Sequence, residues 1–247
     1  MGLARDTEVL VIRLHSIAFA PFPAAELLNP RFRKGHAKLR LVVDAGPAPD
    51  VPDQALMGRL AAAFPGLARH HCQVGDAVAR REPGARGVVL VQDEPTANQA
   101  HLLEHLLLEV LCFLDRSPRL SGVTCAYQSP PERNDVFVEC EHEDSGILAT
   151  HLALDAMNAA LAGEPLAPRF PDALRCARLL RGPAAGAWPV VRLSRAAHIP
   201  RARAEAALEM LAHAAFVEPE TYAMNFSGET HYRFVGAGAP GRAGRGR

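Results

Sequence analysis

The spacing of hydrophobic and polar positions predicts alternating strands and helices over the first two thirds of the chain. Apolar and polar residues alternate in 38–46 (KLRLVVDAG), which predicts a strand that ends at Gly46. Short apolar or alternating runs predict further strands at 8–14, 84–92, 122–128 and 135–143. Helical spacing occupies 53–72, 100–114 and 143–163. We expect Pro65 to interrupt the first of these helices and Gly163 to end the last. The order predicts an α+β fold with helices packed on a mixed sheet.

The pattern changes after 163–171 (GEPLAPRFP), a stretch whose three prolines predict a linker. Beyond it we expect a helix at 171–182, another helix, a turn at Ile199-Pro200, a further helix and two short strands. This order resembles a winged helix-turn-helix module. We therefore predict a first domain over 1–163, a small winged-helix-like domain over 164–236, and a disordered Gly/Arg tail over 237–247.

Composition narrows the class of protein. The chain has 247 residues, 49% of them hydrophobic, which is enough for one large core or two smaller ones. Its 27 basic and 27 acidic side chains give zero formal net charge, so nothing indicates a general attraction to nucleic acid or an anionic membrane. No run approaches the roughly 18 uncharged apolar residues of a membrane span. The start, MGLARDTEVLVIRL, has acidic residues and too short an apolar run for a secretory signal. Five scattered cysteines without a CxxC pair predict free thiols in a reducing cytoplasm.

The helix predicted at 100–114 begins with the pattern His-x-x-Glu-His, formed by His101, Glu104 and His105. Residues four apart share one helix face, so two imidazoles placed in this way can chelate a metal ion at about 2.0–2.1 Å each. Glu104 lies about 60° round the helix from His101, where it can act as a general base without being a ligand. The pattern predicts the site of an inverted zinc hydrolase, with one Zn²⁺, the two histidines as ligands and Glu104 as the catalytic base.

The alternative interpretation is a chance pair of histidines that binds no metal. Eleven histidines in the chain produce some pairs at this spacing by chance. However, burying two imidazoles and a carboxylate on a leucine-rich helix is costly unless the three share a partner. A metal ion is such a partner, which favours the metal site.

A zinc site of this kind needs a third ligand, and the strand predicted at 135–143 (DVFVECEHE) carries candidates. Its two-residue period places Glu139, Glu141 and Glu143 on one face. Three carboxylates repel each other unless a cation or arginines lie among them, although an exposed, solvated edge explains them equally. We predict Glu139 as the third ligand because it lies deepest in the strand, with Glu143 as the alternative. Glu109, about two turns from His101, is expected to orient an imidazole and remains a further alternative.

Two longer segments of the chain resemble a known protein family. The segments 100–111 (AHLLEHLLLEVL) and 134–161 (NDVFVECEHEDSGILATHLALDAMNAAL) resemble the N-terminal domain of cyanophycin synthetases. That family carries a Gly-His-x-x-Glu-His-x-x-x-Glu helix, a strand that ends in Glu-Glu-x-Gly, and a helix rich in Ala and Leu. The segment FPGLARHHC, with His70 and Cys72 in matching places, is similar as well. The resemblance covers roughly residues 8–163, and the ATP-grasp and ligase domains of the synthetases have no counterpart in this chain.

The resemblance implies a reaction. In some of these synthetases the N-terminal domain is a metal-dependent hydrolase that cuts cyanophycin, a poly-aspartate backbone with arginine on each side chain. A relative of that domain is then a zinc metallopeptidase that cleaves cyanophycin, its fragments or another Asp/Arg-type peptide. The family motif matches at the His-x-x-Glu-His residues, at Glu109 and at Glu139. Two features depart from it, since 121–128 (SGVTCAYQ) lacks arginine and His151 stands where an arginine is expected.

The substrate contacts are assigned on charge type alone. Arginine side chains of a substrate would be held by carboxylates in bidentate pairs. We therefore expect Glu141, Glu143 and Asp144 to bind substrate guanidinium groups.

Two other functions compete with hydrolysis. The first is a DNA-binding or protein-interaction regulator that uses the winged-helix-like domain. From 189 to 236 the chain has five arginines and five glutamates, whereas a domain that reads a DNA groove normally has a clear basic excess. DNA binding is therefore disfavoured against dimerisation or substrate docking, and the sequence is compatible with a homo-oligomer. The second is a catalytically silent interaction protein, which has no need for the intact Glu104.

Overall fold

The structure, a computed structural model, describes residues 12–45, 53–69, 99–117, 119–182, 186–220 and 229–236. The fold is α+β, with packed helices and two antiparallel sheets. The elements are β1 (Arg13–Ala20), α1 (Pro23–Leu28), β2 (Lys38–Asp44), α2 (Asp53–Ala63), the 3-10 helix η1 (Pro65–Arg69), α3 (Gln99–Asp115), β3 (Gly122–Ala126), β4 (Arg133–Glu139), α4 (Glu143–Leu161), α5 (Arg169–Leu180), β5 (Trp188–Pro189), α6 (Val190–Ala197), α7 (Arg201–His213), β6 (Val217–Glu220) and β7 (His231–Phe234).

The larger sheet has the strand order β1-β2-β4-β3, and all its described pairs are antiparallel. The prediction of a mixed sheet is therefore wrong for the described strands. The reason lies in the connections, because β3 and β4 are joined by a short loop, and only a long crossover makes neighbouring strands parallel. The strand predicted at 84–92 lies outside the described residues.

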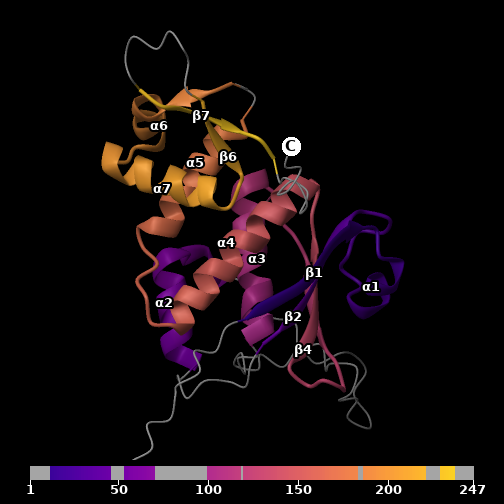
Figure 1. Cartoon of the computed structure of the whole chain (residues 1–247). Coiled ribbons are helices and arrows are strands. Elements are labelled where there is room, and N and C mark those ends of the chain that lie inside the picture. Colours follow the sequence, from indigo (N-terminus) through magenta and orange to yellow (C-terminus); the bar gives the residue numbers. More distant parts are fainter. Residues whose placement is uncertain are drawn as a thin grey trace, which may run out of the picture.

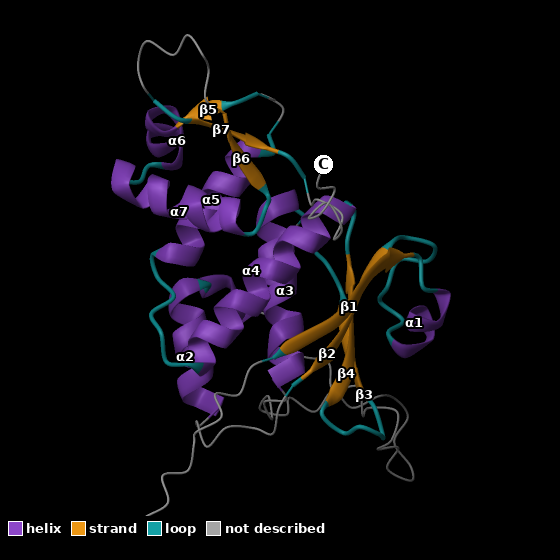
Figure 2. Ribbon diagram, viewed as in Figure 1, coloured by secondary structure: helices purple, strands orange, loops and turns teal. Residues whose placement is uncertain are grey.

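Helices cover one face of this sheet, and a short segment covers part of the other. Figure 2 shows α3 and α4 on one side of the strands and α1 on the opposite side. The two-residue period of β2 places Leu39, Leu41 and Val43 toward the long helices, and all three are fully buried. On the other face, Phe137 of β4 contacts Phe22 with ring centroids 5.6 Å apart. The face that each strand residue occupies decides which candidates can reach α3.

A buried lysine anchors the segment between β1 and β2. The side chain of Lys38 is fully buried, and its Nζ donates to three oxygens at 2.9 Å: the carbonyls of Pro21 and His36, and Oε1 of Glu26. A buried ammonium group needs such partners, because burying an unpaired charge is very costly. Lys38 therefore holds the two ends of the α1 segment together.

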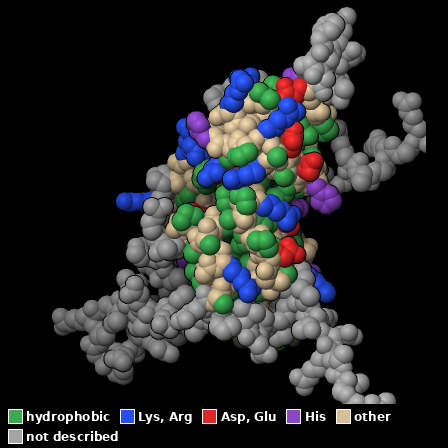
Figure 3. Space-filling model, turned by 90° about the vertical axis from the view of Figure 1, so that its left-hand side faces the viewer, with side chains coloured by type: hydrophobic (Ala, Val, Ile, Leu, Met, Phe, Trp, Pro, Cys, Tyr) green, Lys and Arg blue, Asp and Glu red, His purple; other side chains and the backbone are tan. Residues whose placement is uncertain are grey.

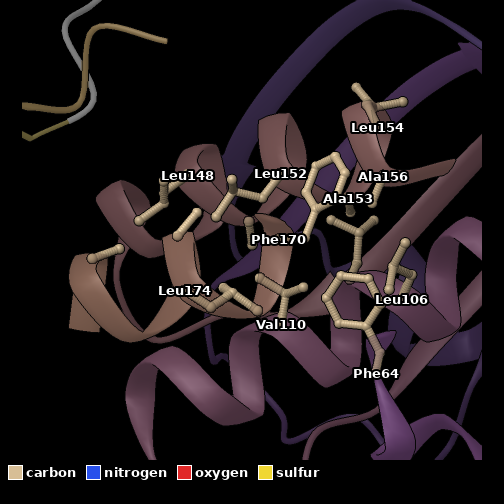
Figure 4. Close-up of a cluster of buried hydrophobic side chains, with 14 of the residues drawn as sticks. Phe64, Leu106, Val110, Leu148, Leu152, Ala153, Leu154, Ala156, Phe170 and Leu174 are labelled. Carbon is tan, nitrogen blue, oxygen red and sulfur yellow. The ribbon is translucent and has the colours of Figure 1, made fainter. Parts of the chain in front are cut away.

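The helices meet in one buried hydrophobic cluster that extends from Ile12 to Val217, across the predicted boundary at 163. Figure 4 shows Phe170 of α5 among side chains of α3 and α4, and its side chain is 1% exposed. A polar contact links the same three helices, since Ser145 of α4 donates to Asp115 of α3 at 2.5 Å and Arg181, which follows α5, donates to Asp115 at 3.3 Å. The second sheet, of order β5-β7-β6, lies beside α6 and α7 at the far end of the molecule (Figure 1).

Several element predictions are confirmed, and others are corrected. The helix after 53 stops before Pro65, and α4 ends just before Gly163, which takes a positive φ of 79°. The strand predicted at 135–143 ends earlier, at Glu139, so that Glu143 opens α4 instead of ending a strand. The pattern missed α1, β5 and most of β1. The predictions for 8–11, His70 to Cys72, 84–92 and the tail at 237–247 fall outside the described residues.

Within the described residues, no helix is long and apolar enough to span a membrane.

Candidate functional site

The two histidines of α3 converge at the N-terminal end of this helix. His101 Nε2 and His105 Nε2 lie 3.0 Å apart, and their rings stack with centroids 4.8 Å apart. His105 is 8% exposed, and burial lowers the pKa of His101, which favours the neutral imidazole that a metal requires. The pair is therefore formed by local helix geometry, since residues four apart lie one turn above each other.

The spacing of the two nitrogens can be compared with metal ligation. Two nitrogens bound to one tetrahedral zinc ion at about 2.0–2.1 Å stand about 3.3 Å apart. The observed 3.0 Å is close to that value, so the spacing of the two ring nitrogens is compatible with one shared ion. The same distance also suits an N–H···N hydrogen bond between two neutral rings. The pair fits two ligands of an ion, and fits a hydrogen-bonded pair equally.

Glu104 lies between α3 and β3. Its side chain is 6% exposed, and its Oε2 accepts a hydrogen bond of 2.5 Å from the hydroxyl of Thr124. A Cβ at Gly122 would lie 2.7 Å from Glu104 Oε1, so a glycine at this position makes room for the carboxylate. Burial raises the pKa of Glu104 to about 7, against the opposite effect of the Thr124 hydrogen bond. A carboxylate that exchanges its proton near neutral pH suits a general base.

Glu109 extends the stripe of His101 and His105 by one more turn. Its carboxylate lies over Gly66 of η1, and a Cβ at Gly66 would stand 1.8 Å from Glu109 Oε1. Gly66 is therefore required for this position of the carboxylate. Whether Glu109 orients an imidazole remains a prediction.

Glu139 lies away from the histidines. Its carboxylate accepts hydrogen bonds from the backbone N–H of Arg33, at 2.7 Å, and of Ser121, at 3.1 Å. Because Val138 and Val136 of β4 pair with Gly122 and Thr124 on the face of the sheet toward α3, Glu139 belongs to the opposite face. The structure does not bring the predicted ligand set of His101, His105 and Glu139 together.

No other cluster of metal-binding side chains replaces this set among the described residues. Across the described ranges, no group of three or more His, Cys, Asp or Glu side chains lies close enough to hold a metal ion. The structure therefore brings two of the three predicted ligands side by side, the described residues supply no third, and metal binding stays a prediction.

The predicted substrate carboxylates also lie elsewhere. Glu143 and Asp144 open α4, whose first turn contacts Asp115 at the C-terminal end of α3 through Ser145. Asp115 is ten positions after His105, which corresponds to about 15 Å along the helix. Glu141 pairs with Arg33 Nη1 at 3.3 Å on the other side of the sheet. Glu141, Glu143 and Asp144 therefore do not face the histidine pair.

Three residues of the site carried no signal in the sequence. Thr124, Gly122 and Gly66 are common residue types without a motif, and their contacts with Glu104 and Glu109 appear only when α3 packs on β3 and η1. The alternation of β3 places Gly122 and Thr124 on one face, but only the fold shows what lies against that face.

Comparison with known proteins finds no matching family model and no matching curated protein.

Proposed function

We propose that this protein is a metal-dependent hydrolase, with His101 and His105 as metal ligands and Glu104 as the general base. One observation carries the proposal: two imidazole nitrogens converge to 3.0 Å on the helix that also presents a buried carboxylate with a pKa of about 7. Perturbed carboxyl groups next to potential ligands are typical of catalytic sites.

The chemistry is divided between an ion and the protein's own side chains. A bound Zn²⁺ would polarise the carbonyl that is attacked. Glu104 takes a proton from the attacking water and delivers it to the leaving amine. The Thr124 hydroxyl, 2.5 Å from Glu104 Oε2, keeps the carboxylate aimed during both transfers. His101 and His105 would hold the ion at the start of α3.

We infer an amide substrate of the Asp/Arg type, with cyanophycin or its fragments as the first candidate. The support is the resemblance of α3 and of the β4–α4 segment to the cyanophycin synthetase domain. The positions of Glu141, Glu143 and Asp144 do not support their expected role in binding substrate at the histidine pair. Residues other than these three would therefore recognise the side chains of the substrate.

The decisive experiment incubates the purified chain with insoluble cyanophycin, with and without a chelator, and analyses the soluble products by mass spectrometry. We expect β-Asp-Arg units or short multiples of them, and no release when the chelator is present. Glu104→Gln should retain about one equivalent of zinc per chain and lose activity by about 10²–10⁴-fold. His101→Ala should lose the metal. A wild-type protein without metal in elemental analysis, or a fully active Glu104→Gln variant, contradicts the proposal.

For the C-terminal part we propose a winged-helix-like module that makes protein contacts and does not bind DNA. The two arginines at the start of α7 are engaged within the chain: Arg201 pairs with Glu205 at 2.9 Å, and Arg203 pairs with the buried Asp172 at 2.6 Å. The face in Figure 3, on the side of α7 in Figure 1, carries basic and acidic side chains next to one another. Arginines held in this way are poor phosphate contacts.

Retention on immobilised duplex DNA over a range of salt concentrations tests this assignment. We expect elution at low salt without a steep dependence, because few counterions would be released. Tight retention that falls steeply with salt would identify a DNA-binding module.

A further inference from the structure

Strand β3 forms an edge of the larger sheet. It pairs with β4 alone, in the order β1-β2-β4-β3, among the described strands. Glu139 N donates to Ser121 O at 2.8 Å, and Tyr127 N donates to Arg133 O at 2.9 Å. Because hydrogen-bonded pairs alternate along an antiparallel ladder, Val123 and Cys125 also direct their backbone groups at β4. The backbone groups of the residues between them point outward.

The outward row consists of the N–H and C=O groups of Gly122, Thr124 and Ala126. Within the described residues, one hydrogen bond is recorded to this row, from Asn29 Nδ2 to the Gly122 carbonyl at 2.7 Å. The other groups of the row form a short template to which an extended chain can pair.

This template lies directly beside the proposed catalytic residues. Thr124, in the middle of the row, donates its hydroxyl to Glu104, and Gly122 makes room for the same carboxylate. Viewed down α3, three fully buried leucines lie to one side of Glu104: Leu103, Leu107 and Leu111. His101 and His105 lie about 60–100° round the helix to the other side of Glu104. Since the core lies inward of the edge strand, the histidines lie on the side of α3 toward the β3 edge of the described sheet.

We propose that the substrate docks as an added strand on the edge of β3, so that its backbone lies beside Glu104 and the histidine pair. An added strand lies about 4.8 Å from its neighbour, which places it below the histidine side of α3. The ligand is an extended peptide backbone with free amide groups, and a poly-aspartyl chain meets this requirement. The inference rests on the proposed hydrolase function of the same site.

The backbone of β3 then contributes to the affinity for the substrate without contacting the substrate's side chains. Backbone hydrogen bonds give affinity in strand addition, and pockets for alternate side chains give specificity. This agrees with the positions of Glu141, Glu143 and Asp144, which do not face the site. In this docking mode Thr124 and Ala126 are positioning residues, because their outward backbone groups orient the scissile bond.

The first test uses labelled hexamers of the cyanophycin repeat and the full chain carrying Glu104→Gln, with binding measured by fluorescence anisotropy. The unmodified hexamer and a hexamer with every second amide N-methylated should bind alike. Successive amides of an extended chain point to opposite edges, so the second peptide still has one edge with free N–H groups and can shift by one residue to present it to β3. A hexamer with all amides N-methylated should lose at least ten-fold in affinity. Equal binding of all three hexamers overturns the proposal.

The second test alters the edge. Ala126→Pro removes one outward N–H and leaves the ladder to β4 intact, since proline is tolerated on the open side of an edge strand. Ala126→Val keeps the N–H and is the matched control. We expect Ala126→Pro to weaken hexamer binding about three- to ten-fold, and Ala126→Val to change it less than two-fold. Unchanged far-ultraviolet circular dichroism verifies that both variants fold.

The outcomes separate this inference from the hydrolase proposal. Cleavage of cyanophycin together with insensitivity to N-methylation and to Ala126→Pro overturns the docking mode and leaves the hydrolase intact. Binding that depends on free amides, without cleavage by the wild-type chain, supports the docking mode and refutes the hydrolase. A wild-type dimer in sedimentation that Ala126→Pro dissociates assigns the edge to a second copy and overturns the proposal.

Discussion

Replacing Lys38 by methionine removes the hydrogen bonds that its buried ammonium group donates while nearly preserving side-chain volume. Lys38 Nζ lies 2.9 Å from the carbonyl oxygens of Pro21 and His36 and from Glu26 Oε1. Each buried acceptor left without a donor costs about 1–3 kcal/mol. The two carbonyls belong to a segment near the surface, so part of this cost is recovered by water. We expect the free energy of unfolding to fall by about 2–3 kcal/mol.

Urea denaturation with an unchanged slope measures this loss. The matched control is Lys34→Met, which alters an exposed lysine of the same segment and should change stability by less than about 0.5 kcal/mol. Amide exchange should accelerate through 21–37 in the Lys38 variant. Because Asn29 and Arg33 of this segment contact Gly122 and Glu139, the edge of β3 should loosen as well. A Lys38→Met variant as stable as Lys34→Met would refute the anchoring role.

Three further outcomes are expected. Gly122→Ala places a Cβ 2.7 Å from Glu104 Oε1 and should lower the rate of hydrolysis at least ten-fold. The control is Gly58→Ala, whose added Cβ has nothing within 4 Å and should leave the rate unchanged. Turnover of the two variants is compared under one assay. Phe170→Ala should destabilise the chain by about 3–5 kcal/mol in denaturant titration, because Phe170 fills the junction of three helices. Burial raises the pKa of Glu104 from 4.5 to about 7, so the folded state holds this proton more tightly than the unfolded chain. The metal-free protein should therefore lose stability relative to Glu104→Gln as the pH rises from 4.5 to about 7, and parallel stability curves for the two proteins would contradict this assignment.

Local features of the site follow from the sequence. The four-residue spacing of His101 and His105 predicts their convergence as soon as the segment is helical, and the leucines around them predict a buried helix. Pro65 and Gly163 predict the ends of α2 and α4 for backbone reasons alone. Each of these conclusions depends on residues within a few positions of one another.

The partners of Glu139 cannot be predicted from spacing along the sequence. Its alternation with Val138 is evident from the sequence, but alternation states only that the two side chains point to opposite faces. The packing of α3 on the valine face decides that Glu139 meets Arg33 and Ser121 instead of the histidines.

Elements that depend on short-range spacing, including the helix that carries His101, Glu104 and His105, follow from the amino-acid sequence. The partners of these three residues depend on tertiary packing. Thr124 is 20 positions from Glu104 along the chain, and Arg33 is 106 positions from Glu139. Contacts over such separations depend on how helices and strands pack together, and that packing reflects the burial of the whole apolar core instead of any local pattern.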